Sequence, residues 1–336
     1  MNTKRIISLV ASLALVLSLS VGLTGCGDKA AQDDNQGSTD GEGTKYTVGI
    51  CQLVQHEALD AATQGFIDAL NEALPGQVEF QNKNASGDNV NCSTIVNGFV
   101  SDGVDLIMAN ATGALTAAAA ATSDIPILGT SITAYGVALD IDDFNGTVGG
   151  NISGTSDLAP LDKQAAMLQE LFPNAKKVGM LFCSSEPNSK YQVDEVTKLL
   201  SAAGITCTEY TFTDSNDVSS VTQKACDDSD VLYIPTDNTA ASNTEAIANV
   251  VLAAGTPVIA GEAGICRGCG VATLSIDYYE LGKITGQMAA KILTGEADIS
   301  TMPVEFAPTA TKQANMANCE KLGITVPADY TALATE

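Results

Sequence analysis

The stretch "YTVGICQLVQHEALDAATQGFIDALNEAL", residues 46–74, joins an apolar, β-branched run to a helical pattern. The run predicts a strand over 46–53, and the remainder predicts a helix over 58–74. One face of that helix carries its apolar residues, which are Leu59, Ala62, Phe66, Ala69 and Leu70. A strand that leads directly into an amphipathic helix is the building unit of a parallel sheet covered by helices.

The same alternation continues along the chain and restarts after residue 151. Further strands are predicted over 78–85, 104–111, 125–132, 176–183, 206–212, 231–235, 257–261, 270–276 and 302–308. Further helices are predicted over 89–103, 112–124, 159–173, 189–204, 218–228, 243–255 and 277–295. Two half-chains with the same order of elements predict an α/β fold of two doubly wound parallel-sheet lobes. We expect residues 45–151 plus 277–302 in lobe 1, and residues 152–276 plus 303–336 in lobe 2.

The N-terminus has the pattern of an export signal over residues 1–25, with a basic start and a long apolar run. Its last residues, "LTGC" at 23–26, resemble the bacterial lipobox, which implies cleavage before Cys26 and lipidation of its sulfur. An uncleaved transmembrane anchor is the alternative. Residues 26–44 are polar and glycine-rich, which predicts a flexible tether. We therefore expect an extracytoplasmic protein held at the outer face of the membrane by lipidated Cys26.

The composition excludes some partners and cofactors. With 16 Lys+Arg against 40 Asp+Glu, the net charge is −24, which repels nucleic acid and anionic lipid. Membrane contact is therefore expected through the lipid anchor only. Eight cysteines remain besides Cys26, and we expect most to be free, buried thiols. Cys266 and Cys269 in "CRGC" predict a local disulfide or idle thiols. No metal site and no cofactor is expected, because a zinc site needs two further ligands.

Polar or glycine-containing loops follow six of the predicted strands, at residues 52–60, 109–114, 129–135, 183–189, 235–240 and 261–270. In open α/β sheets, ligands bind outside the carboxyl ends of the strands. Each loop alone is explained as a helix cap. Together the six loops predict a cleft lined by polar groups between the lobes.

An enzyme is not expected in this cleft. Ser184 or Ser185 with His56 and an aspartate would make a hydrolase triad, but the G-x-S-x-G elbow is absent from the sequence. No H-E-x-x-H, P-loop or G-x-G-x-x-G follows a strand either. His56, the single histidine, is interpreted as a wall residue of the cleft, with a structural helix cap as the alternative.

Five segments carry a resemblance to a known family. They are "HEALDAATQGF" (56–66), "NISGTSDLAPLDKQ" (151–164), "SSEPNSKYQ" (184–192), "IPTDNT" (234–239) and "SIDYYELGKITG" (275–286). With the lipobox, they resemble the TrpX-like, tryptophan/tyrosine-type substrate-binding lipoproteins of bacterial ABC importers. Glu57 stands where that family usually has proline. The resemblance implies the type I periplasmic-binding fold, in which three crossover strands form the hinge between two lobes.

The resemblance also implies a small solute, an aromatic amino acid in the first instance, and an ABC permease with its ATPase as partner. The protein is expected to be a monomer. Expected donors to a carboxylate are Thr112, Ser131, Ser184 and Ser185, and expected acceptors from an ammonium are Asp157, Glu186 and Asp237. Asn188 and Asn238 suit either end, and Tyr135 and Tyr278 suit the side chain. Gln52, His56, Ser156, Glu262 and Asp277 complete the expected ligand-binding residues. A surface sensor of the same fold and a serine hydrolase are the alternatives.

Overall fold

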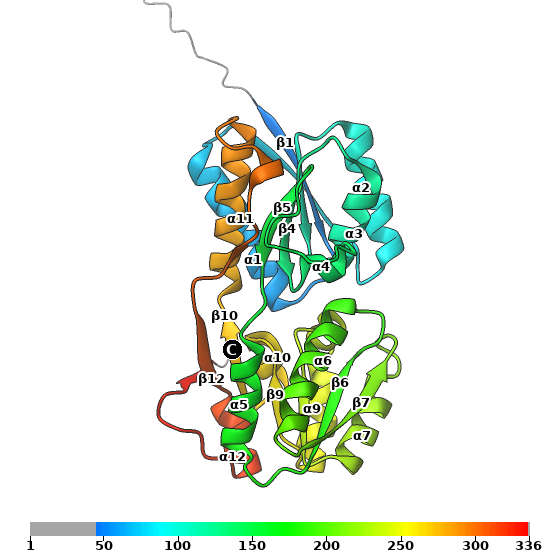
Figure 1. Ribbon diagram of the computed structural model, residues 1–336, viewed down its shortest axis with the longest axis vertical. Coiled ribbons are helices and arrows are strands. Elements are labelled where there is room, and N and C mark those ends of the chain that lie inside the picture. The colour runs from blue at the N-terminus through cyan, green and yellow to red at the C-terminus, as the bar shows by residue number, and fades with distance from the viewer. Residues whose placement is uncertain (1–44, 335–336) are drawn as a thin grey trace, which may run out of the picture. The chain divides into compact units, whose positions relative to one another are not determined.

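The computed structural model describes residues 45–334. The predicted signal segment, the lipobox cysteine and the tether lie outside these residues. Within residues 45–334, no helix combines the length and the hydrophobicity that a membrane crossing requires. The strands of this part of the chain form two separate sheets, and helices cover both faces of each (Figure 1).

The first sheet is parallel throughout and has the strand order β11-β5-β4-β3-β1-β2. Its strands are β1 (Tyr46–Gln52), β2 (Val78–Asn84), β3 (Leu106–Asn110), β4 (Ile127–Ile132), β5 (Ile152–Ser156) and β11 (Glu305–Phe306). Its helices are α1 (Glu57–Ala73), α2 (Asn89–Asp102), α3 (Thr112–Ala121), α4 (Tyr135–Ala138), α11 (Tyr278–Leu293) and the 3-10 turn η1 (Ile299–Thr301). Helices α1 and α11 pack on one face, where Phe66 and Met288 are buried, and α2 and α3 pack on the other, around Phe99.

The second sheet has the order β13-β12-β10-β9-β8-β6-β7 and is parallel except where β12 meets β10. Its strands are β6 (Lys177–Cys183), β7 (Thr206–Phe212), β8 (Val231–Ile234), β9 (Val258–Ala260), β10 (Ala272–Ile276), β12 (Ala310–Ala314) and β13 (Thr331–Ala332). Its helices are α5 (Leu161–Leu171), α6 (Pro187–Ala202), α7 (Val218–Asp228), α8 (Asn238–Ala241), α9 (Thr244–Ala254), α10 (Ala263–Gly268) and α12 (Met316–Leu322). This lobe has a core on each face of its sheet, around Phe182 and around Phe212.

The lobe boundaries differ from the predicted ones in two places. Strand β5, which we expected in lobe 2, pairs with β4 in the first sheet, and β11 joins the outer edge of β5. The glycine-rich approach to β5 looks like a linker, but Gly149 and Gly150 have φ values of 84° and 60° and make a turn into the strand. The chain therefore crosses between the lobes at 157–160, at 277 and at 307–309, which are the three segments of the hinge.

Helices α1 and α11 touch backbone to backbone. A Cβ atom at Gly65 would lie 2.1 Å from the carbonyl oxygen of Tyr279, and one at Gly282 would lie 2.0 Å from that of Ala62. Real Cβ atoms do not approach so closely, so glycine is required on both helices. This contact attaches α11 to lobe 1 although the chain enters α11 from lobe 2.

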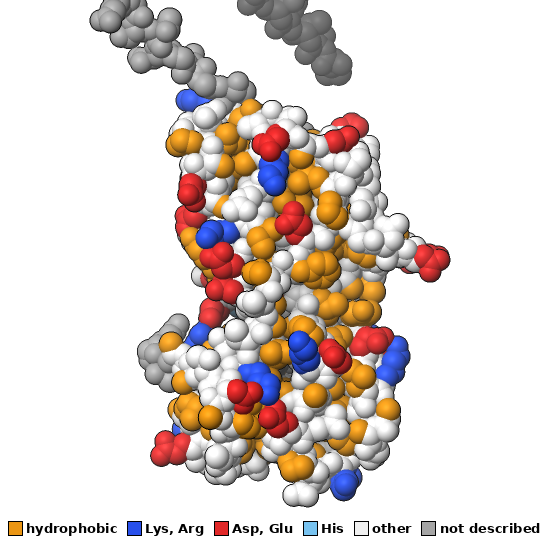
Figure 2. All heavy atoms as spheres, turned by 60° about the vertical axis from the view of Figure 1, so that its left-hand side comes forward, with side chains coloured by type: hydrophobic (Ala, Val, Ile, Leu, Met, Phe, Trp, Pro, Cys, Tyr) orange, Lys and Arg blue, Asp and Glu red, His pale blue; other side chains and the backbone are white. Residues whose placement is uncertain are grey.

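The surface carries few exposed large apolar side chains in the described part, and they are scattered as Val90, Val137, Leu199, Tyr279, Phe306 and Met316. On the face shown in Figure 2, acidic and basic side chains are interspersed. All eight cysteines between residues 45 and 334 are free thiols, and only Cys207 is partly exposed. Cys266 and Cys269 lie on and just after α10, where burial raises the pKa of both thiols.

Candidate functional site

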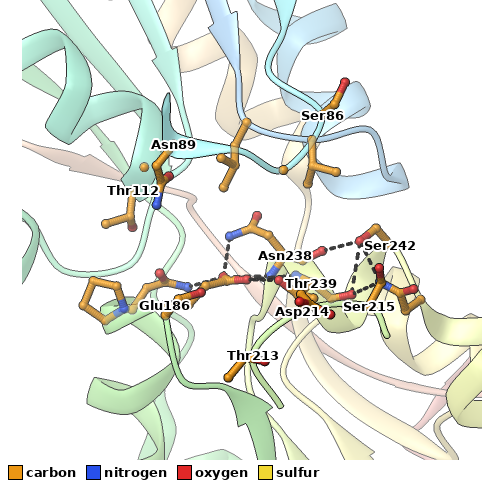
Figure 3. Close-up of a pocket in the computed structure, with 18 of the residues that line it drawn as sticks. Ser86, Asn89, Thr112, Glu186, Thr213, Asp214, Ser215, Asn238, Thr239 and Ser242 are labelled. Carbon is orange, nitrogen blue, oxygen red and sulfur yellow. Dashed lines mark hydrogen bonds between the residues drawn. The ribbon is translucent and has the colours of Figure 1, made fainter. Parts of the chain in front are cut away.

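A cavity of about 540 Å³ lies between the carboxyl ends of the strands of the two sheets (Figure 3). Lobe 1 contributes Leu53, Val54, Ser86, Gly87, Asn89, Thr112, Gly113 and Thr116. Lobe 2 contributes Ser185, Glu186, Pro187, Asn188, Thr213, Asp214, Ser215, Asn238, Thr239, Ser242 and Asn243. Both lobes therefore supply polar groups and a smaller number of apolar ones to the same space.

The lobe 1 wall is built around the N-terminus of α3. Thr112 is its first residue, and the preceding Ala111, with φ of 85°, makes no side-chain cap. The amide groups of a first helical turn have no partner within the helix and carry the positive end of its dipole. Gly113 follows, and a Cβ atom there would lie 2.2 Å from Oδ1 of Asn89. Glycine at 113 thus leaves room for Asn89 at the cavity.

The lobe 2 wall is built around the carboxylate of Glu186, which is only 8% exposed. Its Oε1 accepts hydrogen bonds from the amide and the hydroxyl of Thr239, both at 2.8 Å. Its Oε2 accepts from the amide of Asn238 at 2.9 Å, from Nδ2 of Asn238 at 2.7 Å and from Nδ2 of Asn188 at 3.2 Å. No basic side chain of residues 45–334 forms an ion pair with it. The carboxylate is fixed in place without a neutralising cation.

His56 lies at the start of α1 in lobe 1, partly exposed, and its Nε2 is 3.2 Å from Oδ1 of Asn238 in lobe 2. Its side chain does not cap the helix. Burial lowers the pKa of the imidazole, while Asn238 and the charges of Glu186 and Asp60 act in the opposite direction to a smaller extent. The ring is therefore a contact between the lobes rather than a cap.

The predicted site residues separate into three groups. Thr112, Ser185, Glu186, Asn188 and Asn238 line the cavity. His56 and Glu262 line a neighbouring hollow between the lobes, together with Glu57 and Arg267. The remaining predicted residues are Gln52, Ser131, Tyr135, Ser156, Asp157, Ser184, Asp237 and Asp277, and they do not line the cavity.

Two of the predicted ammonium acceptors are engaged in internal hydrogen bonds. Asp157 accepts from Thr133 Oγ1 at 3.0 Å and from the hydroxyl of Tyr278 at 2.9 Å, instead of capping α5. Asp237 is 1% exposed and accepts from the amides of Cys183 and Ala240, both at 2.7 Å. Both side chains hold segments of the fold at the cleft, which leaves Glu186 as the acid at the cavity wall among the three.

Other predicted residues also serve the fold. Gln52 links Asp60 and Thr63 of α1 to the end of β1, Ser156 Oγ donates to the carbonyl of Thr133, and Asp277 is exposed and caps α11. The hydroxyl of Tyr135 donates to the carbonyls of Gly129 and Thr155, so this ring is not part of a side-chain box at the cavity. Tyr278 likewise lies outside the cavity lining. Ser131 is buried with φ of 56°, and its Oγ has no hydrogen-bond partner within the described residues.

The triad hypothesis finds no support in the geometry. Ser184 Oγ donates to the carbonyl of Phe212 at 3.3 Å, Ser185 Oγ lies 3.1 Å from Cys183 Sγ, and His56 is hydrogen-bonded to Asn238. Neither serine is paired with the imidazole. Within residues 45–334 there is also no group of three or more His, Cys, Asp or Glu side chains arranged to hold a metal ion.

Sequence reasoning missed the cavity residues that follow β2 and β7. Ser86, Gly87 and Asn89 come after β2, and Thr213, Asp214 and Ser215 come after β7. Both strands lie at an edge of their sheet, and both are largely exposed. The rule that ligands bind at the carboxyl ends of strands applies to them too, and would have found these loops.

Buried acids stand close to the cleft. Burial raises the pKa of Glu262 to about 7, although its carboxylate accepts hydrogen bonds from the amides of Gly264 and Ile265. Burial and the charge of Glu186 raise the pKa of Asp237 to about 8. Burial also raises the pKa of Asp157, which the hydroxyls of Tyr278 and Thr133 partly offset. Each of these acids keeps its proton to a higher pH in the folded state than in the unfolded state. The free energy of unfolding therefore depends on pH.

Comparison with known proteins identifies this architecture. The model of the ABC transporter substrate binding protein family matches residues 47–336. A tyrosine-binding protein of Clostridioides difficile is 36% identical over 315 residues, covering 90% of this chain and 88% of that protein. A Streptococcus pneumoniae structure in complex with L-Trp has a TM-score of 0.82 at 30% identity, covering 87% of this chain and 100% of the other.

A third relative is described in a different state. The ligand-free, open structure of a Clostridium difficile substrate binding protein with adhesive properties has a TM-score of 0.66 at 35% identity, covering 87% of this chain and 100% of the other. The fold and the extent of these matches confirm the predicted two-lobed α/β architecture. The chain belongs to the ABC transporter substrate-binding protein family, and it is an extracytoplasmic solute-binding protein with the type I periplasmic-binding fold.

Proposed function

We propose that this protein binds one aromatic amino acid in the cavity between its lobes and delivers it, unchanged, to an ABC permease. The observation that carries the proposal is the chemistry of the two walls. The uncapped N-terminus of α3 lies on the lobe 1 side, and the Glu186 carboxylate lies on the lobe 2 side. Similarity to a tyrosine-binding protein and to an L-Trp complex supports the same class of solute.

The α-carboxylate of the solute would bind at the start of α3. Amide groups and the positive end of a helix dipole stabilise an anion there. The hydroxyl of Thr112 stands at the same position and offers a further donor. Burying a carboxylate is costly unless it is hydrogen-bonded, and this end of the cavity supplies donors.

The α-ammonium would lie toward Glu186. Its five hydrogen-bond donors hold the carboxylate still, but they bring no positive charge. An ammonium group in the cleft would supply that charge and gain a Coulomb interaction that strengthens as the closing lobes exclude water. The side chain of the solute would pack on Leu53, Val54 and Pro187, which are the apolar members of the lining.

Binding would favour the closed arrangement, because the solute contacts both walls only when they face each other. The TM-score is higher with the L-Trp complex than with the ligand-free, open structure, although identity is higher with the latter. This supports the interpretation that the two lobes of residues 45–334 are in a closed arrangement. The lipobox at Cys26 supports anchoring to the membrane, and we propose that the protein acts as a monomer.

The test is a thermal-unfolding screen of residues 27–336 with the twenty amino acids. A ligand at 100 times its Kd adds about 2.7 kcal/mol of stability, which shifts the melting temperature measurably. We expect a shift with tyrosine, tryptophan or phenylalanine, and unchanged solute after incubation, measured by chromatography. A shift with a sugar or nucleoside alone would contradict the amino-acid proposal. Metabolic labelling with a lipid probe, lost in Cys26→Ser, tests the anchor.

A further inference from the structure

Within residues 45–334, a single ion pair joins the two lobes. Arg267, the only arginine of residues 45–334, lies on α10 in lobe 2, and its guanidinium Nη1 bonds to Oε2 of Glu57 on α1 in lobe 1. The other ion pairs of residues 45–334 are each confined to one lobe and involve Lys190, Lys198, Lys283 and Lys312. The Glu57–Arg267 pair is therefore the one whose formation depends on how the lobes meet.

Each partner is in a favourable position within its own lobe. Glu57 is the first residue of α1, where the helix dipole favours a negative charge, and Arg267 is in the last turn of α10. The Nε of Arg267 also donates to the carbonyl of Ala334 at 3.0 Å, which orients the guanidinium toward lobe 1. Because Arg267 is oriented by this contact within its own lobe, its side chain loses less conformational entropy when the pair forms.

The backbone around the pair is closely packed as well. A Cβ atom at Gly264 would lie 3.4 Å from Cβ of Glu57, so the start of α10 lies against the start of α1. Neither Glu57 nor Arg267 lines the solute cavity. The contact is thus an interface between the lobes beside the cavity, and a solute in the cavity does not need to touch it.

We propose that Glu57 and Arg267 form a latch that stabilises the closed arrangement without contacting the solute. The latch raises the fraction of closed protein before any solute binds. The apparent affinity for the solute rises in proportion to this fraction. The pair is partly exposed, with side chains 47% and 25% accessible, so salt weakens it. The affinity part of this proposal rests on the proposed function, whereas the closure part does not.

The first measurement is small-angle X-ray scattering of solute-free protein, comparing wild type with Glu57→Gln and Arg267→Gln. We expect a larger radius of gyration in both variants, and in wild type at 0.5 M salt. Glu280→Gln, which removes an equal charge from an ion pair within α11 of lobe 1, is the matched control and is expected to scatter like wild type. Unchanged scattering in both latch variants, with correct folding by circular dichroism, would overturn the latch.

The second measurement is a double-mutant cycle on the Kd of the amino acid found by the screen. Each single substitution should weaken binding about two- to fivefold. The double variant should bind no more weakly than the single variant with the lower affinity, because the pair is lost once either partner is removed. Independent, additive losses would contradict a direct pair. If no amino acid binds, the proposed function fails, and the scattering result still decides whether the latch exists.

Discussion

Nε2 of His56 and Oδ1 of Asn238 lie 3.2 Å apart across the cleft, between residues 182 positions apart in the chain. Asn238 uses its Nδ2 to donate to Glu186 at 2.7 Å, so its Oδ1 is the acceptor facing His56. His56 therefore donates through Nε2–H, which selects this tautomer of the neutral ring. The imidazole is connected through Asn238 to the carboxylate at the cavity wall, which gives the only histidine of the chain a role in joining the lobes.

The first prediction concerns this hydrogen bond. His56→Ala removes one contact of the closed arrangement, which at about 0.5–1.5 kcal/mol should weaken solute binding about two- to tenfold. His56→Gln, which keeps a donor at the end of its side chain, should restore part of the affinity. Isothermal titration calorimetry measures both. Equal affinities of wild type and His56→Ala would show that the hydrogen bond contributes nothing to closure.

The second prediction concerns the room at the start of α3. Gly113→Ala places a Cβ atom against Asn89 Oδ1, so the Asn89 side chain must move within the cavity. Because Asn89 is exposed and its side-chain amide can turn away, we expect little loss of folding stability, but a shift of this group within the cavity should weaken the Kd about fivefold, roughly 1 kcal/mol. A melting temperature near that of wild type, combined with unaltered affinity, would place the solute away from α3.

The third prediction concerns Glu262 and pH. Its pKa is about 7 in the folded protein against an ordinary value of 4.5, so between these values the folded state holds a proton that the unfolded state has lost. Its contribution is complete below pH 4.5 and disappears as pH rises through 7, a loss of at most about 3 kcal/mol. His56 acts in the opposite sense, since its lowered pKa gives stability that is lost as pH falls below 6.5.

Urea unfolding at pH 5 and pH 8, compared between wild type and Glu262→Gln, isolates the contribution of Glu262. The unfolding free energy at pH 5 minus that at pH 8 should be lower in Glu262→Gln than in wild type, because the contribution of Glu262 is lost while that of Asp237, which has the same sign, remains. Glu320→Gln, at an exposed position on α12, serves as the control and should retain the full difference. The same pH difference in wild type and Glu262→Gln would refute the assignment to this buried carboxyl.

The fourth prediction compares two glycines in helices. Gly282→Ala forces a Cβ atom against the backbone of Ala62, where α1 and α11 touch, and should destabilise the protein by about 1–3 kcal/mol. Gly98→Ala, in α2 with no atom within 4 Å of the added Cβ, should stabilise it by about 0.5–1 kcal/mol. Chemical denaturation measures both. Destabilisation of equal size at the two positions would contradict the assignment of the loss at Gly282 to packing between α1 and α11.

The alternation of apolar runs and amphipathic segments was sufficient to predict most strands and helices, because the buried residues of each element recur with the spacing of a helix or a strand. Four of the six predicted polar loops, at 52–60, 109–114, 183–189 and 235–240, supply residues to the cavity, whereas those at 129–135 and 261–270 supply none. Strand β12, "ATKQA", escaped notice because it is half-exposed and has no apolar run. Strand β5 was placed in the wrong lobe because its sheet partner, β4, is not identified by any local pattern.

Among the acids, Asp157, Glu186 and Asp237 look alike in sequence, since each begins or precedes a helix. The tertiary structure decided that Glu186 faces the cavity while the other two bind internal donors. It also brought His56 to Asn238, and Glu57 to Arg267 across 210 positions. The sequence by itself determined the elements and the kind of fold, since these follow from local burial. Only the docking of the two lobes decided the pairs between them, because contacts between lobes depend on relative orientation and not on the periodicity of each segment.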